Sequence, residues 1–98
     1  MATAKEAFAD ITAYMNTNGG APSAWYAGIA SDPRQRLFND HNVAEQGGTW
    51  IYRTCSTDDD ARIVEDALIR MGCKGGGGGG DASTKAVYAY KITPHTAE

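Results

Sequence analysis

Hydrophobic residues recur at helical spacing in three segments of the chain. The first segment runs from about Ala4 to Met15. The second begins at Pro33, a residue that suits the first position of a helix, and continues through residues 34–41. The third follows Thr57 and ends at Gly72, and its apolar stripe consists of Ala61, Val64, Leu68 and Met71. The spacing therefore predicts three helices.

Three other segments alternate between aromatic or large apolar side chains and smaller or polar ones, which is the pattern of a β-strand. They are residues 24–30, 49–55 and 85–93, and glycine or proline lies close to each of them. We therefore expect a small α/β (α+β) fold, a three-stranded antiparallel sheet flanked by about three helices. Residues 1–98 are expected to form one domain.

Composition indicates a globular protein without membrane attachment. Of the 98 residues, 42% are hydrophobic and 21% are charged, and no run approaches the roughly 18 apolar residues that cross a bilayer. The amino terminus lacks the long apolar run of a secretory signal, so a cytoplasmic location is expected. In that reducing setting Cys55 and Cys73 are expected to be free thiols. The net charge of −3 argues against nucleic-acid binding by bulk positive charge, so any phosphate site must be local.

Two segments carry no predicted helix or strand. Residues 75–80 are six consecutive glycines, which form either a flexible surface connection or a backbone loop that approaches an anion closely. Lys74 and Lys85 flank this loop and would contribute positive charge. Residues 94–98 form a tail that is expected to be frayed.

The stretch from residue 24 to 41 carries the most specific motif. The tripeptide Tyr26-Ala27-Gly28 lies on a predicted strand, and Arg36 follows Tyr26 by ten positions on the next predicted helix. A further strand and a helix bearing Glu65 come next. Over residues 24–71 the chain resembles the GIY-YIG nuclease-like superfamily. In that family a YIG strand precedes a helix with an arginine and a histidine, then a strand, then a helix with a metal-binding glutamate.

The resemblance implies a metal-dependent endonuclease that hydrolyses the phosphodiesters of nucleic acid. Glu65 would hold one Mg²⁺ or Mn²⁺ ion, because these hard cations favour oxygen ligands. Arg36 would clamp the phosphate, Tyr26 or a second tyrosine would position or deprotonate the attacking water, and His41 would assist proton transfer. Further contacts to a nucleic-acid or nucleotide phosphate are expected from the basic residues Arg34, Arg53, Lys74 and Lys85.

Two departures from the family pattern change what the site can be. No strand carrying the GIY half of the motif precedes Tyr26. The strand at 85–93 has a similar composition, so Tyr88 or Tyr90 would fill the missing tyrosine's place through a permuted connection. The family's histidine follows the arginine by four positions, whereas His41 follows by five, and one extra residue turns a side chain by about 100° around a helix. The second hypothesis is therefore a catalytically inactive module that binds a nucleotide or nucleic acid; the small single domain would suit a phage product.

Each candidate residue also has a purely structural interpretation. Tyr26 would pack an edge strand with a solvated hydroxyl, Arg36 would cover apolar surface with its stem, and His41 would lie exposed at a helix end. Glu65, on the flank of a buried helix face, would pair with Arg36 or Arg53. A third hypothesis is an oligomer-forming protein whose interface anchors are Trp25, Phe38 and Trp50.

Overall fold

The last strand in the sequence lies in the middle of the sheet. In the computed structural model, residues 1–75 and 82–98 are described. Within these ranges β1 (Trp25–Ala30) and β2 (Trp50–Thr54) both pair antiparallel with β3 (Ala86–Lys91), in the order β1-β3-β2. The three predicted strands are confirmed, each slightly shorter than expected. Because β3 is central, its side chains meet those of both edge strands.

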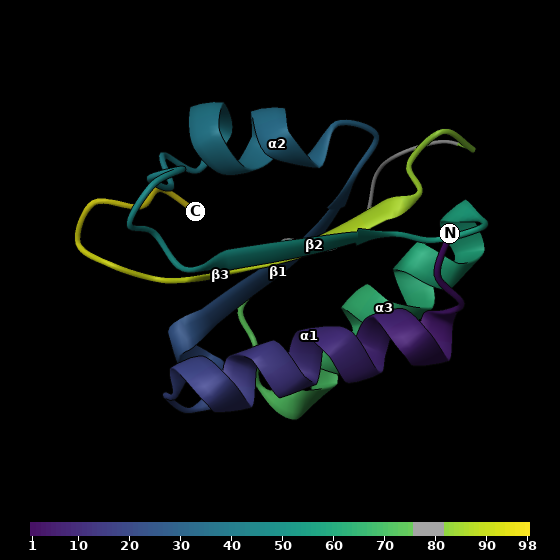
Figure 1. Cartoon of the computed structure of the whole chain (residues 1–98), viewed down its shortest axis with the longest axis horizontal. Coiled ribbons are helices and arrows are strands. Elements are labelled where there is room, and N and C mark those ends of the chain that lie inside the picture. The colour runs from purple at the N-terminus through teal and green to yellow at the C-terminus, as the bar shows by residue number, and fades with distance from the viewer. Residues whose placement is uncertain (76–81) are drawn as a thin grey trace.

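Helices cover both faces of this sheet, as Figure 1 shows. Helices α1 (Ala4–Asn18) and α3 (Asp58–Met71) lie on one face, and α2 (Pro33–Gln35) lies on the other. The α1 helix begins with the capping box of Thr3 and Glu6 and continues past its predicted end at Met15. Over the described residues, the fold is therefore the predicted α+β arrangement of three helices and a three-stranded antiparallel sheet.

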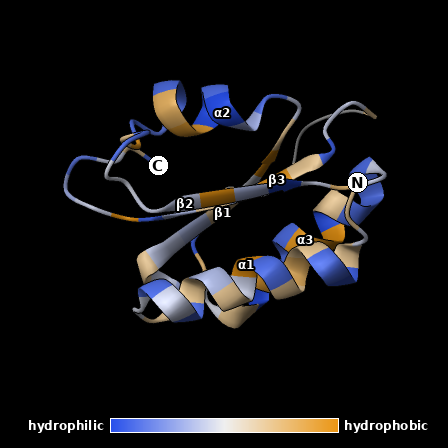
Figure 2. Ribbon diagram, viewed as in Figure 1, coloured by the Kyte–Doolittle hydropathy of each residue, from blue (hydrophilic) through white to orange (hydrophobic). Residues whose placement is uncertain are grey.

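The larger core lies between the sheet and the helices α1 and α3. Apolar residues alternate with polar ones along both helices (Figure 2), and the apolar ones reach the sheet. Trp25 is 0% exposed in this core, so it cannot be an interface anchor. Met71, the last member of the predicted α3 stripe, is instead exposed. The buried members from all elements are Ala7, Ile11, Met15, Trp25, Ala27, Ile51, Cys55, Ala61, Val64, Leu68, Cys73, Val87 and Ala89.

A second, smaller core lies under α2 on the other face of the sheet. After Gln35 the helix widens into a π-helical segment, η2 (Arg36–Asp40). The His41 N–H donates to the Arg36 carbonyl at 2.8 Å, which closes a turn of five residues rather than four. The buried residues of this second core come from helix, loop and sheet and are Ala30, Leu37, Val43, Tyr88 and Tyr90.

The tail at residues 94–98 is docked, so the expectation that it is frayed is wrong. The Ala97 N–H donates to the His41 carbonyl at 2.7 Å, and the Asn42 side-chain amide donates to the His95 carbonyl at 2.8 Å. Both contacts join the tail to the end of the π-helical segment. These hydrogen bonds, rather than burial of the tail itself, hold the segment against the end of the helix.

Several smaller expectations can be compared with the structure. Cys55 and Cys73 are free thiols, as predicted, and the structure shows in addition that both are buried. None of the helices in the described ranges has the length and apolar character that a bilayer span requires. The glycine run, apart from Gly75, lies outside the described residues, and so does its predicted role in anion binding.

Candidate functional site

Tyr88 lies at the centre of the polar cluster on the α2 face. It projects from β3, is 1% exposed, and faces Gly28 of the neighbouring strand in the antiparallel register. A β-carbon built on Gly28 would lie 2.5 Å from the Tyr88 hydroxyl oxygen and 2.6 Å from Cζ of its ring. Only glycine leaves this space free. The glycine of the YIG-like tripeptide therefore makes room for a tyrosine that comes from the last strand.

The Tyr88 hydroxyl is hydrogen-bonded to a buried histidine. His41 is 3% exposed, and its Nε2 lies 2.7 Å from the Tyr88 hydroxyl oxygen. Its Nδ1 lies 2.7 Å from the Ala97 carbonyl oxygen, which can only accept a hydrogen bond. Nδ1 therefore carries the proton, and Nε2 accepts from the Tyr88 O–H. Burial lowers the pKa of His41, so the ring is neutral at pH 7 and its Nε2 has a free lone pair, although it is a weaker base than an exposed imidazole.

The widened helical turn brings His41 to this position. In a regular α-helix a residue five positions after Arg36 would point to another side, whereas in the π-helical turn the two residues are joined by a backbone hydrogen bond. The predicted exposure of His41 at a helix end is therefore wrong. The helix does end there, but the ring turns inward, and the five-residue spacing no longer separates His41 from Arg36.

Arg36 lies on the outer side of the same hydroxyl. Burial alone would lower the pKa of Arg36, but the charge and hydrogen bond of Tyr88, with the charges of Asp40 and Tyr26, raise it. Its Nε lies 3.4 Å from the Asp40 carboxylate, and its side chain is 46% exposed. Arg36 is therefore held beside Tyr88 while much of its guanidinium remains accessible to a ligand.

Burial raises the pKa of Tyr88 to about 12, although the positive charge and hydrogen bond of Arg36 act in the opposite direction. The charges of Tyr26 and Glu65 also raise it. At neutral pH Tyr88 is therefore an uncharged phenol. It donates to His41 and lies within the electrostatic range of an arginine and a carboxylate.

Glu65 is buried on α3, with 8% of its surface exposed, and burial raises its pKa. The predicted pairing of Glu65 with Arg36 or Arg53 is wrong, because Arg36 pairs with Asp40 and Arg53 with Asp10. Within residues 1–75 and 82–98, the Glu65 carboxylate forms no ion pair, although the charge of Arg62 on the same helix partly opposes the effect of burial on its pKa. Its connection to the cluster is the electrostatic interaction with Tyr88.

Tyr26 packs on the aromatic side of the cluster. Its ring stacks on Tyr90 with centroids 5.3 Å apart and lies 4.8 Å from the ring of His41. It lies on an edge strand, as its structural interpretation predicted, and its charge also acts on Tyr88. The structure thus brings Tyr26, Arg36, His41 and Tyr88 together.

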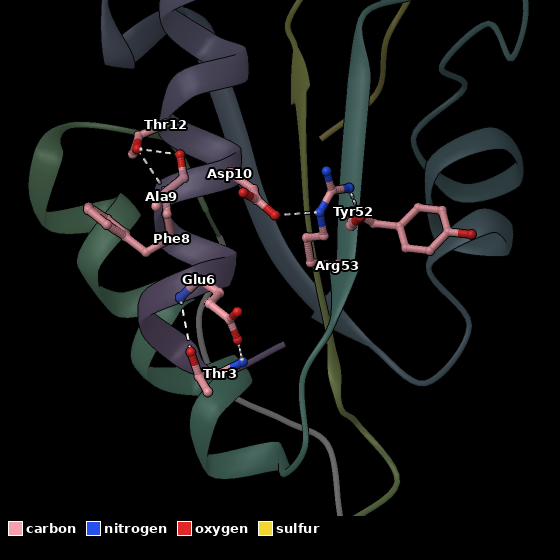
Figure 3. Close-up of polar contacts among 8 residues, drawn as sticks. All are labelled: Thr3, Glu6, Phe8, Ala9, Asp10, Thr12, Tyr52 and Arg53. Atoms are coloured by element: carbon pink, nitrogen blue, oxygen red, sulfur yellow. Dashed lines mark hydrogen bonds and ion pairs between the residues drawn. The ribbon is translucent and has the colours of Figure 1, made fainter. Parts of the chain in front are cut away.

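Two of the predicted substrate-binding arginines lie elsewhere. Arg53 is on β2, where its guanidinium contacts the Asp10 carboxylate of α1 at 3.0 Å and its own strand at the Tyr52 carbonyl (Figure 3). Arg34 pairs with Glu45 and lies over the ring of Phe38 at 5.2 Å. Both arginines are therefore engaged away from Tyr88, and the structure does not bring them to the cluster.

The two predicted lysines lie near opposite ends of the sheet. Lys74 forms a parallel bridge with Tyr26 at the outer edge of β1, and its side chain is exposed. Lys85 precedes β3, where its carbonyl accepts from the Cys55 N–H at 2.8 Å. Of the two, Lys74 is adjacent in the backbone to a member of the cluster.

Sequence reasoning missed one member of this site, the carbonyl of Ala97. A backbone carbonyl has no residue-type signature, so no sequence signal could have found it. Tyr90 was named only as an alternative to Tyr88, but its hydroxyl lies 3.1 Å from His41 Nδ1 and donates to the same Ala97 carbonyl at 3.3 Å. Its position two residues from Tyr88 on one strand face was the available signal.

The chain matches no known family model, no curated protein and no solved structure.

Proposed function

We propose that this protein is a metal-dependent endonuclease that hydrolyses phosphodiester bonds of nucleic acid, as its resemblance to the GIY-YIG nuclease-like superfamily implies. The observation that carries the proposal is the 2.7 Å contact between the Tyr88 hydroxyl and His41 Nε2, with Arg36 beside the same hydroxyl. A phenol, a neutral base and an accessible cation at one point are the groups that phosphodiester hydrolysis requires.

The Tyr88–His41 pair would act as a proton relay. Tyr88 takes a proton from the attacking water as it passes its own proton to His41 Nε2. The water oxygen bonds to phosphorus, the bond from phosphorus to the departing sugar oxygen breaks, and that oxygen takes up a proton from solvent. His41 then returns its proton through Tyr88 to solvent, which restores the neutral base for the next turnover. Because the pKa of Tyr88 is raised to about 12, a free phenolate is scarce at neutral pH, and the unprotonated Nε2 at 2.7 Å is the acceptor into which the phenol can pass its proton as the water attacks.

Arg36 would stabilise the charge that develops on the phosphoryl oxygens. Its side chain is 46% exposed and its ion pair with Asp40 is 3.4 Å long, so a phosphate can approach it without breaking a buried network. A guanidinium presents several donors in a fixed plane, which suits two phosphate oxygens at once.

Glu65 fits the role of ligand for Mg²⁺ or Mn²⁺. It is a buried carboxylate without an ion pair among the described residues, and its pKa is raised by burial, so a cation beside it would relieve an unfavourable charge. When bound, such an ion supplies electrostatic stabilisation of the phosphate. With one carboxylate as protein ligand, most of the coordination positions of the ion would be filled by water and substrate, as Mg²⁺ commonly prefers.

The experiment is cleavage of labelled single- and double-stranded DNA and RNA with Mg²⁺ or Mn²⁺. Tyr88→Phe removes the relayed proton and should lower kcat by about 100-fold or more, and Arg36→Ala should cause a loss of similar size. Arg34→Ala is the matched control, because it removes an exposed arginine of α2 that lies outside the cluster.

Wild-type turnover that survives Tyr88→Phe would remove Tyr88 from the mechanism. Absence of turnover by the wild type with every substrate and both metals would overturn the nuclease proposal. In that case, micromolar nucleotide binding measured by calorimetry would favour the inactive binding module.

A further inference from the structure

The tail at residues 94–98 returns to the candidate site and contacts the buried His41. The Ala97 N–H donates to the His41 carbonyl at 2.7 Å, and the Ala97 carbonyl accepts from His41 Nδ1 at 2.7 Å. Ala97 therefore forms two hydrogen bonds with His41, one with its backbone carbonyl and one with its imidazole ring. The His41 ring is 3% exposed, so a ring nitrogen left without a partner would be costly, and the Ala97 contact therefore favours one arrangement of the ring.

Neighbouring contacts hold the tail in the same place. The Tyr90 hydroxyl donates to the Ala97 carbonyl at 3.3 Å, and the Asn42 amide donates to the His95 carbonyl at 2.8 Å. Asn42 adopts a left-handed backbone conformation with φ of 56°, which asparagine tolerates better than most residues. The chain thus turns at Asn42 so that its side chain can reach the tail.

This docking decides which histidine nitrogen carries the proton. A carbonyl oxygen cannot donate, so the short Ala97 contact requires a proton on Nδ1 and leaves Nε2 as an acceptor. In the other tautomer Nε2–H would face the Tyr88 O–H and could not take its proton. The tautomer of a neutral histidine is set by the partner of its second nitrogen.

We propose that the docked tail is a working part of the site, in which the Ala97 carbonyl fixes the tautomer and ring orientation of His41 for proton transfer from Tyr88. The inference rests on the proposed nuclease function for its effect on turnover. Ala97 is a positioning residue because it acts through His41. Undocking of the tail would leave the other residues in place and disable the base.

The test variant is Ala97→Pro, which removes the N–H that anchors the tail to the His41 carbonyl. Ala97→Gly is the matched control, because it keeps both the N–H and the carbonyl. Long-range ¹H–¹⁵N NMR of the imidazole should find the wild type and Ala97→Gly protonated on Nδ1. Ala97→Pro should show a population protonated on Nε2. Its kcat should fall by about tenfold or more while KM changes by less than about twofold.

A second variant, Asn42→Gly, keeps the left-handed turn but removes the other tail contact, and it should shift the tautomer in the same direction. Dispersed backbone NMR spectra establish that each variant is folded. A wild-type ring protonated on Nε2 would overturn the inference. Folded Ala97→Pro and Asn42→Gly proteins that both keep the wild-type tautomer would also overturn it.

The two proposals can fail separately. If the wild type cleaves nothing but Ala97→Pro shifts the tautomer, the tail positions His41 and the nuclease proposal is wrong. If the wild type cleaves nucleic acid and Ala97→Pro matches it in tautomer and kcat, the positioning role is wrong and the nuclease proposal stands.

Discussion

The His41 backbone N–H donates to the Arg36 carbonyl, and this single bond places a base and a cation on one side of a helix although five positions separate them. A π-helical turn is rare and is often found at functional sites. Here it turns His41 toward Tyr88 and holds Arg36 beside the same hydroxyl. The local distortion of the helix is thus what assembles the cluster.

Burial of His41 makes the folded protein sensitive to acid. Burial lowers the pKa of His41 below its ordinary value of 6.5, despite the opposing hydrogen bond to Ala97. As the pH falls below about 6.5, the His41 imidazole binds a proton in the unfolded chain but not yet in the folded chain, so the free energy of unfolding should decrease. Urea unfolding between pH 7.5 and 5 measures this slope.

His41→Gln should lose this part of the pH dependence, whereas His95→Gln, in an exposed position, should keep it. Equal slopes for the wild type and His41→Gln would mean that His41 does not resist protonation in the folded state. The comparison between variants matters because carboxylates add their own slope at lower pH.

Gly28 and Tyr88 should be energetically coupled. Because a β-carbon at Gly28 would lie 2.5 Å from the Tyr88 hydroxyl oxygen, Gly28→Ala must push the ring aside and should cost about 1–3 kcal/mol of stability. In a Tyr88→Ala background the same substitution should cost much less. A double-mutant cycle by chemical denaturation measures the coupling, and additive effects would contradict it.

Arg53 should be dispensable for turnover. Its ion pair with Asp10 is solvent-exposed, so Arg53→Ala should change stability by less than about 1 kcal/mol. It should leave kcat within about twofold of the wild type, because its guanidinium faces α1 rather than Tyr88. The cleavage assay decides this, and a loss as large as that of Arg36→Ala would return Arg53 to the site.

The elements of the fold could be predicted because each has a local signature. Thr3 and Glu6 mark the start of α1, and alternation places Tyr88 and Tyr90 on one face of β3. The central position of β3 was not predictable from these patterns, since alternation specifies faces but not neighbouring strands. Docking of the tail depends on hydrogen bonds to backbone groups around residue 41, and these also leave no trace in the sequence.

The same contrast, between residues with a local sequence signature and residues without one, explains which members of the site could be predicted. Arg36, Tyr26 and Tyr88 come from motif positions and strand alternation. Burial of His41 depends on the π-helical turn. The five-residue spacing from Arg36, taken alone, indicated that His41 would point away from the site. Counting positive charges selected Arg34 and Arg53, but a charge count cannot reveal that carboxylates nearby in space already pair with them.

Glu65→Gln should separate metal binding from folding. The amide keeps the shape of the side chain and removes a charge that burial disfavours, so without metal the variant should be at least as stable as the wild type at pH 7. Because the pKa of Glu65 is raised in the folded state, the free energy of unfolding should decrease as the pH rises above the ordinary value of 4.5 and the carboxyl group ionises. Thermal unfolding without metal measures this difference.

Mn²⁺ should stabilise the wild type and not the variant. An ion that binds only the folded state at about 100 times its Kd adds about 2.7 kcal/mol, which a thermal shift readily detects. Asp66→Asn is the matched control, because Asp66 is the next residue of α3 and pairs with Arg70 at 3.0 Å in an exposed position. The control should respond to Mn²⁺ as the wild type does. If Glu65→Gln shows the same Mn²⁺-dependent rise in Tm, the ion binds elsewhere and Glu65 is not its ligand.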